Sequence, residues 1–191
     1  MIRNLVFFLT VIVFSCSSLG ENINITQHSL NKPLKLVLNN RFKDSSYIYL
    51  CFPKTIQIEN SGKTKNMIHN FHLGKHHKGN SAKYYKAYEY DKKLTPKIKR
   101  FIEKERKLSI QIYYGYLLKI SNHRLDTFIK NKTENQILQG FKVYDIPINN
   151  TVKKWALSKI NDSIKGQLHF SLHNKERGFF YKSLDIELFE D

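Results

Sequence analysis

The sequence is poor in the residue types that mark several special classes of protein. It has 2 cysteines, 4 prolines and 8 glycines among 191 residues. So little proline and glycine excludes collagen-like and low-complexity chains, and 41% hydrophobic residues are enough to form a folded core. The length fits one domain. Beyond Cys16 only Cys51 remains, so no internal disulfide is available and the core must supply the stability.

Catalytic motifs are also missing. The sequence contains no P-loop, no Gly-x-Gly-x-x-Gly, no Gly-x-Ser-x-Gly elbow, no His-Glu-x-x-His and no Cys-x-x-Cys. Its acidic residues are too scattered for an EF-hand-like calcium loop. We therefore expect a non-catalytic protein that carries no cofactor.

Acidic residues are half as numerous as basic ones. There are 32 Lys and Arg against 16 Asp and Glu, a formal net charge of +16, and the segment from Lys54 to Lys107 carries much of the excess. Only six of the basic residues are Arg, although planar guanidinium groups are favoured for recognising phosphates and guanine. Nucleic acid is therefore an unlikely partner. An anionic surface polymer such as a polysaccharide, or an envelope protein, is the better expectation for a partner.

The longest apolar run lies at the N-terminus and is too short to span a bilayer. Ten residues, Leu5 to Phe14, follow Arg3, whereas a membrane-spanning helix needs about 20. The pattern matches a secretory signal peptide, which we assign to residues 1–15. No later apolar run approaches the length of a membrane span.

The residues that end this run suggest how the chain is processed. Val13, Phe14, Ser15 and Cys16 resemble the lipobox of bacterial lipoproteins, and with Ser17 and Ser18 they are similar to the relaxed lipobox of the Bacteroidetes group. The resemblance implies lipid attachment at Cys16 and anchoring on a membrane of the cell envelope. It covers about sixteen residues and implies nothing about the remaining chain. The alternative is cleavage before Glu21, which would give a soluble periplasmic or secreted protein.

The hydrophobic pattern predicts the fold of the mature chain. Residues 16–33 are polar and predict a flexible tether. Over residues 34–191, apolar residues alternate with polar ones in short runs, which predicts one all-β domain, an antiparallel β-sandwich of immunoglobulin-like or related type. Its clearest part is a closing hairpin with a turn at Asn174–Gly178. The expected strands are centred on residues 34–38, 47–58, 83–90, 108–114, 141–148, 168–172 and 184–188.

Two segments predict short helices. Thr95 and Pro96 form a helix start, and Ile98, Phe101 and Ile102 follow at helical spacing. A second helix is predicted by Val152, Trp155, Ala156 and Ile160, preceded by capping residues at positions 149–151. We expect the apolar sides of both to pack on the sheets.

Four histidines lie close together in the sequence and offer a metal site or an acid–base group: His69, His72, His76 and His77. Lys75 and Lys78 flank two of them and would repel a cation. We therefore interpret the segment as a flexible basic loop, with no metal bound. A secreted basic hydrolase of phosphodiesterase or nuclease type is the alternative function, and it would need a further partner such as His123, His169, Glu89 or Asp91.

One further segment combines basic and aromatic residues, which can contact an anionic polymer through charge and ring stacking. The candidate ligand-binding residues there are Lys83, Tyr84, Tyr85, Lys86 and Tyr88. Strand alternation offers another interpretation, with tyrosines in the core and lysines in solvent. Taken together, the sequence predicts a non-catalytic, exported, lipid-anchored envelope protein whose β-sandwich binds or scaffolds.

Overall fold

The structure is a computed structural model that describes residues 22–75, 85–91, 93–95, 99–135, 138 and 140–189. It is mostly β, with antiparallel sheets, and it confirms the predicted all-β sandwich. The smaller sheet has the order β12-β11-β4-β7. Its strands are β4 (Asn66–Gly74), β7 (Arg100–Ile102), β11 (Gln167–Asn174) and β12 (Gly178–Asp185).

The larger sheet has eight strands in the order β6-β5-β8-β3-β2-β10-β9, and β1 also pairs with β3. Its strands are β1 (Ile23–Ser29), β2 (Leu34–Arg41), β3 (Ser45–Asn60), β5 (Tyr85–Asp91), β6 (Lys93–Thr95), β8 (Arg106–Ser121), β9 (Glu134–Asn135) and β10 (Lys142–Ile146). The helices are α2 (Asn122–Ile129), α3 (Asn150–Lys159) and the single turn α4 (Asp162–Lys165).

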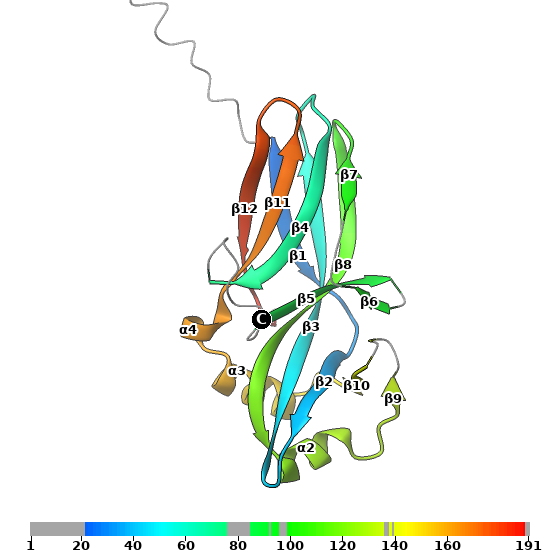
Figure 1. Cartoon of the computed structure of the whole chain (residues 1–191), viewed down its shortest axis with the longest axis vertical. Helices are drawn as coiled ribbons and strands as arrows, with labels where there is room; N and C mark the ends of the chain where they lie inside the picture. Colours follow the sequence, from blue (N-terminus) through cyan, green and yellow to red (C-terminus); the bar gives the residue numbers. More distant parts are fainter. Residues whose placement is uncertain are drawn as a thin grey trace, which may run out of the picture.

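Two long strands, β3 and β8, form the centre of the molecule. Each has 16 residues, and they pair along their whole length, from Ser45 opposite Ser121 to Asn60 opposite Arg106. At about 3.4 Å per residue they extend for roughly 50 Å. Figure 1 shows them running from the helices at one end to the tips of the smaller sheet at the other. We call the part of the molecule near the helices the helical half and the part that contains the smaller sheet the sandwich half.

The burial pattern of β3 changes between the two halves. Residues 48–54 are all buried, whereas residues 55–60 alternate between buried and partly exposed. In the sandwich half, the inward residues Ile56 and Ile58 pack in one core with Phe170 and Leu172 of the smaller sheet. The larger sheet is thus covered on both faces where β3 is continuously buried, and on one face where burial alternates.

The inner face of the helical half is covered by α2 and α3. Phe128 of α2 meets Trp155 of α3 edge-on, with ring centroids 5.0 Å apart. The helix predicted around Val152–Ile160 is confirmed as α3, whose N-cap Asn149 accepts a hydrogen bond from the Val152 backbone N–H at 2.9 Å. Helix α2 was not predicted, although Ser121 caps it and Leu125 is fully buried.

The predicted closing hairpin is confirmed as β11 and β12. Its turn is held by Asn174, whose Oδ1 accepts from the backbone N–H groups of Glu176 and Arg177 at 3.1 and 2.7 Å. The second strand begins and ends earlier than expected. Gly178 already pairs with Asn174, and residues 186–188 fall beyond the end of β12.

The predicted tether is wrong for residues 23–29, which form β1. This strand pairs with the last seven residues of β3, from Ile23 opposite Asn60 to Ser29 opposite Lys54. Ile23 is buried and Ile25 packs against the same core, so backbone pairing and these two apolar side chains order a segment that looks polar by composition. Residues 16–21 lie outside the described residues.

The helix predicted from Thr95 is also wrong where the structure describes it. Thr95 ends β6, and residues 100–102 form β7, which pairs with residues 66–68 of β4. Phe101 and Ile102 point to opposite sides of this strand, since Phe101 is 60% exposed and Ile102 only 1%. Pairing with a distant strand overrides the local helix signal.

The outer face of the larger sheet carries a second, smaller core. Here tyrosine rings lie beneath lysine side chains, and we call it the tyrosine–lysine face. The Nζ atoms of Lys32, Lys35 and Lys86 lie 4.2 to 6.0 Å from ring centroids. Cys51 is fully buried within it, and burial raises the pKa of Cys51 to about 12, which keeps the thiol protonated and unreactive. The tyrosines are Tyr49, Tyr88, Tyr90 and Tyr113.

Candidate functional site: the outer face of the smaller sheet

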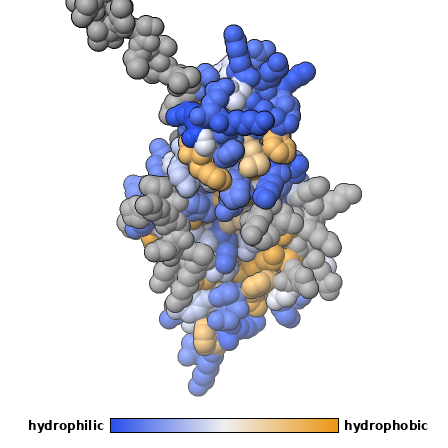
Figure 2. All heavy atoms as spheres, turned by 45° about the horizontal axis from the view of Figure 1, so that its top comes forward, coloured by the Kyte–Doolittle hydropathy of each residue, from blue (hydrophilic) through white to orange (hydrophobic). Residues whose placement is uncertain are grey.

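The outer face of the four-stranded sheet exposes large aromatic side chains. Phe101 is 60% exposed, Phe179 58% and Tyr181 54%. Such side chains are usually buried, and a group of them on one face marks an interaction surface. Figure 2 shows hydrophobic patches across this end of the molecule, surrounded by hydrophilic residues.

Strand register aligns these side chains. Phe101 of β7 is opposite Met67 of β4, Met67 is opposite His173 of β11, and His173 is opposite Phe179 of β12. Residues directly opposite in a sheet point to the same side. The four side chains therefore form one row across all four strands, about 14 Å long at about 4.8 Å per strand. Together with His69 and Tyr181 we call this the phenylalanine–histidine face.

Histidines hold the Phe179 ring in place. The ring of His173 lies 4.9 Å from that of Phe179 at an interplanar angle of 62°, and the ring of His69 lies 5.4 Å away at 79°. Both contacts are edge-on, so they leave ring surface exposed. At the other end of the row, Lys65 Nζ lies 4.4 Å from the Phe101 ring centroid.

A β-bulge brings His69 to this face. The register between β4 and β11 shifts at Ser171 and Leu172. In β4 the buried residues Ile68 and Phe71 are three positions apart, so both intervening residues, His69 and Asn70, are exposed. Without the extra residue, strict alternation would send one of them inward.

The predicted histidine loop is wrong over residues 67–74, which belong to β4. Pairing with β11 and β7 fixes this segment as a central strand of the sheet. His76 and His77 lie outside the described residues. Within the described ranges, no three side chains of the His, Cys, Asp and Glu types are grouped so as to hold a metal ion.

The hydrolase alternative named histidines and carboxylates, and the structure brings two of the histidines together. The rings of His72 and His169 lie 5.1 Å apart. His169 is buried, and its Nε2 donates to the Gly74 carbonyl at 3.2 Å, so in the neutral ring Nδ1 accepts from the Ser183 hydroxyl at 2.7 Å. These partners give His169 a structural role.

The other residues named for a hydrolase lie elsewhere. His123 is in α2, at the opposite end of the molecule. Glu89 in β5 accepts from the Arg100 guanidinium, with Nε at 3.0 Å, and Asp91 ends the same strand. The fold therefore does not gather the named set into one site.

Of the residues predicted to bind a ligand, the two tyrosines that the structure describes lie in the two cores. Tyr85 and Tyr88 are both 7% exposed, the former in the main core and the latter beneath the tyrosine–lysine face. The Tyr85 hydroxyl donates to the Ile164 carbonyl at 2.8 Å. Lys86 Nζ lies 5.6 Å from the Tyr49 ring centroid. Lys83 and Tyr84 lie outside the described residues.

Sequence reasoning missed the phenylalanine–histidine face although part of its signal was available. The closing hairpin was predicted, and alternation along its first strand already places His173 on the side opposite Leu172. Phe179 comes just after the turn, but its position opposite His173 follows only from the exact length of that turn. The pairing of Phe101 with Met67 could not be predicted, because residues 100–102 were expected to form a helix and instead form β7.

Comparison with protein-family models, with curated proteins and with solved structures finds no match to this chain. Its function must therefore be argued from its own residues. None of the helices that the structure describes has the length and apolar character of a membrane span. Cys16 and the rest of residues 1–21 lie outside the described part.

Proposed function

We propose that this chain is a non-catalytic, exported protein of the bacterial cell envelope, held on a membrane by lipid at Cys16, which binds an acidic polysaccharide on its phenylalanine–histidine face. The observation that carries the binding proposal is the cross-strand row whose two ends are the exposed rings of Phe101 and Phe179. This row of side chains is distinct from the ligand-binding segment expected from the sequence.

The chemistry of the face suits a sugar chain. Exposed rings offer flat apolar surface to the C–H groups of a pyranose. His69 and His173 next to Phe179 supply ring nitrogens that can hydrogen-bond hydroxyl groups. Because the row crosses four strands in a line, it offers successive contacts to an extended polymer.

Charge favours an acidic polymer over a neutral one. The chain carries a formal +16, which attracts polyanions. At the tips of the sandwich half, the turns 61–65, 103–105 and 175–177 carry five basic residues and three acidic ones. The basic residues are Lys63, Lys65, Lys104, Lys175 and Arg177, and the acidic ones are Glu103, Glu105 and Glu176.

Gel retardation tests the binding. Native gels containing polygalacturonate or, for comparison, neutral dextran would be run with the unmodified chain and with Phe179→Ala/Tyr181→Ala. We expect polygalacturonate to retard the unmodified chain and the double variant to bind about tenfold more weakly, which corresponds to about 1.4 kcal/mol. Added salt should weaken the retardation.

Phe42→Ala is the matched control. Phe42 is 54% exposed but lies in the turn between β2 and β3, at the far end of the helical half. Equal retardation of this control and the double variant would contradict the proposal. If the unmodified chain were instead dimeric by light scattering and the double variant monomeric, the face would be an interface between two copies, and the polysaccharide proposal would fail.

Cys16→Ala tests the anchor separately. We expect this substitution to move the protein from the membrane fraction to the soluble one and to abolish fatty-acid labelling, because the acyl chains would supply the membrane affinity. Cys51→Ala is the control, since Cys51 is buried. Membrane retention of the Cys16 variant would refute lipid attachment there.

A further inference from the structure

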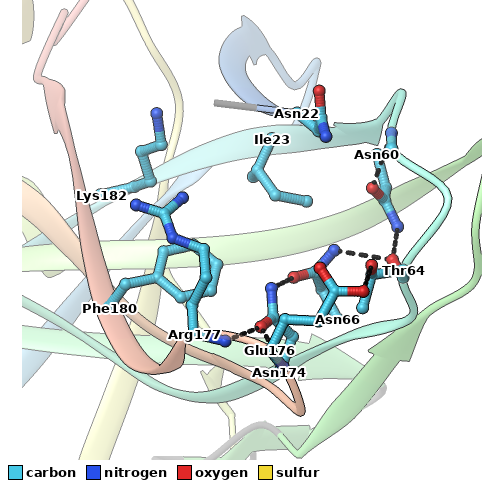
Figure 3. A pocket seen from close by; sticks show the side chains of 11 residues that line it. Asn22, Ile23, Asn60, Thr64, Asn66, Asn174, Glu176, Arg177, Phe180 and Lys182 are labelled. Carbon is cyan, nitrogen blue, oxygen red and sulfur yellow. Dashed lines mark hydrogen bonds between the residues drawn. The ribbon is translucent and has the colours of Figure 1, made fainter. Parts of the chain in front are cut away.

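A small polar pocket opens at the tips of the sandwich half, between the start of β1, the end of β3 and the β11–β12 turn. Its volume is about 40 Å³. One water molecule needs about 10–15 Å³ by the same kind of measure, so the pocket accepts a carboxylate group but not a whole sugar ring. Figure 3 shows basic side chains on one side of it and amides on the other.

The amide side is rigid. Asn60 is fully buried, and its Nδ2 donates to the carbonyls of Thr64 and Glu103 at 2.8 and 3.0 Å. Asn174 Nδ2 donates to Asn66 Oδ1 at 2.9 Å. These buried amides join both sheets at the tips and fix the walls of the pocket, so a ligand would meet a preformed site.

The pocket wall also depends on a glycine. A Cβ atom on Gly62 would lie 2.7 Å from the side chain of Asn22, closer than such atoms approach. The lack of a side chain at position 62 therefore lets the Asn22 amide lie at the rim of the pocket (Figure 3).

The basic side is led by Arg177. Its guanidinium carbon lies 5.0 Å from the Phe180 ring centroid, a cation–π contact. No ion pair to Arg177 is found among the described residues, whereas Glu176, the acid in the lining, is held by the Thr64 hydroxyl at 2.7 Å. Lys182 lies beside the guanidinium in Figure 3.

We infer that this pocket binds the carboxylate of a uronic-acid unit, with the Arg177 guanidinium as the principal donor. A planar guanidinium presents paired N–H groups that match the two oxygens of a carboxylate. This inference rests on the proposed polysaccharide binding and names its sugar class. Arg177 and Phe179 belong to one hairpin, and the pocket lies on the Phe180 side of β12, so a polymer stacked on Phe179 would have to pass over the turn to place a carboxylate in it.

Nuclear magnetic resonance titration of the full chain with single sugars tests the pocket without the polymer. We expect D-glucuronate to shift the backbone amide signals of residues 174–182, and D-glucose, which lacks the carboxylate, to leave them unchanged. Arg177→Gln should weaken glucuronate binding at least tenfold. Arg124→Gln, which removes an exposed Arg from α2 in the helical half, should leave it unchanged.

Equal weakening of glucuronate binding by the two Arg substitutions would overturn the inference, because binding would then depend only on the net charge of the chain. Acetate binding as tightly as glucuronate would overturn the assignment to a sugar acid. The proposed function fails separately. If polygalacturonate retardation is absent while glucuronate still shifts residues 174–182, polymer binding is refuted and the pocket stands. If retardation depends on Phe179 but glucuronate shifts nothing, the pocket alone is refuted.

Discussion

Both sheets carry aromatic side chains on an outer face, but these side chains are buried on the larger sheet and exposed on the smaller one. On the tyrosine–lysine face, Tyr49, Tyr88 and Tyr113 are at most 7% exposed, and lysine ammonium groups lie over the rings of Tyr49 and Tyr113. On the phenylalanine–histidine face, Phe179 remains 58% exposed because its histidine neighbours meet it edge-on.

Packing against neighbouring strands explains the difference. The tyrosines lie in the smaller core together with apolar side chains of the adjacent strands. A lysine alone does not close a ring to solvent, because Phe101 stays 60% exposed although Lys65 Nζ lies 4.4 Å from its ring centroid. Aromatic rings interleaved with lysines in a sequence can therefore be closed to ligands where neighbouring strands cover them.

The largest effect that separates the two faces is expected at high pH. On the tyrosine–lysine face, burial raises the pKa values of Tyr49, Tyr88 and Tyr113 as well as that of Cys51, which rises to about 12. The folded chain keeps these protons at pH values where the unfolded chain, with ordinary pKa values of about 8.5 to 10, has lost them. The free energy of unfolding is therefore intact below about pH 8 and falls as pH rises, by several kcal/mol between about pH 9 and 11.

Urea unfolding at about pH 8, 10 and 11 measures this dependence. Tyr113→Phe should make the decline shallower by about one proton, because it removes one group with a raised pKa from the tyrosine–lysine face. Phe179→Ala should leave the slope unchanged, since its side chain does not titrate. A free energy of unfolding that is flat across this pH range would show that these tyrosines are not held in a buried state.

A smaller effect, about 2–3 kcal/mol, is expected from Gly115→Ala beneath the same face. Gly115 in β8 is opposite Cys51 in β3, and a Cβ atom there would lie 2.5 Å from Cys51 Sγ. The overcrowding should lower the urea midpoint.

Cys51→Ala in the same chain should restore part of the loss, because it removes the sulfur while the Cys51 Cβ, at 3.5 Å, is an ordinary contact. A double-mutant cycle gives the coupling between the two positions. Additive losses would mean that the two side chains do not compete for this space.

The sequence was sufficient to predict the elements whose residues contact residues nearby in the chain. The hairpin of β11 and β12 and the helix after Asn149 were predicted from local alternation, turn residues and capping. β1 and β7 were not, because their partners lie in β3 and β4, far away in the sequence. Nothing within residues 23–29 or 100–102 alone indicates these pairings.

The candidate site was harder to predict than the fold. His69 and His72 were recognised as chemically notable, but the bulge that exposes His69 depends on pairing with β11. Tyr85 and Tyr88 were assigned to ligand binding because the sequence does not show that both faces of β5 are covered. The open face emerges only once strand register and burial are known.

The pairing of β3 with β8 also constrains when the chain can fold. Their paired residues are 46 to 76 positions apart in the sequence, so closing the ladder requires a long intervening loop to be ordered. During synthesis from the N-terminus, the central ladder cannot be completed until residue 121 has emerged. A chain with this topology cannot complete its central sheet early in synthesis. This suits the export proposed for it, since an exported chain crosses the membrane before it folds.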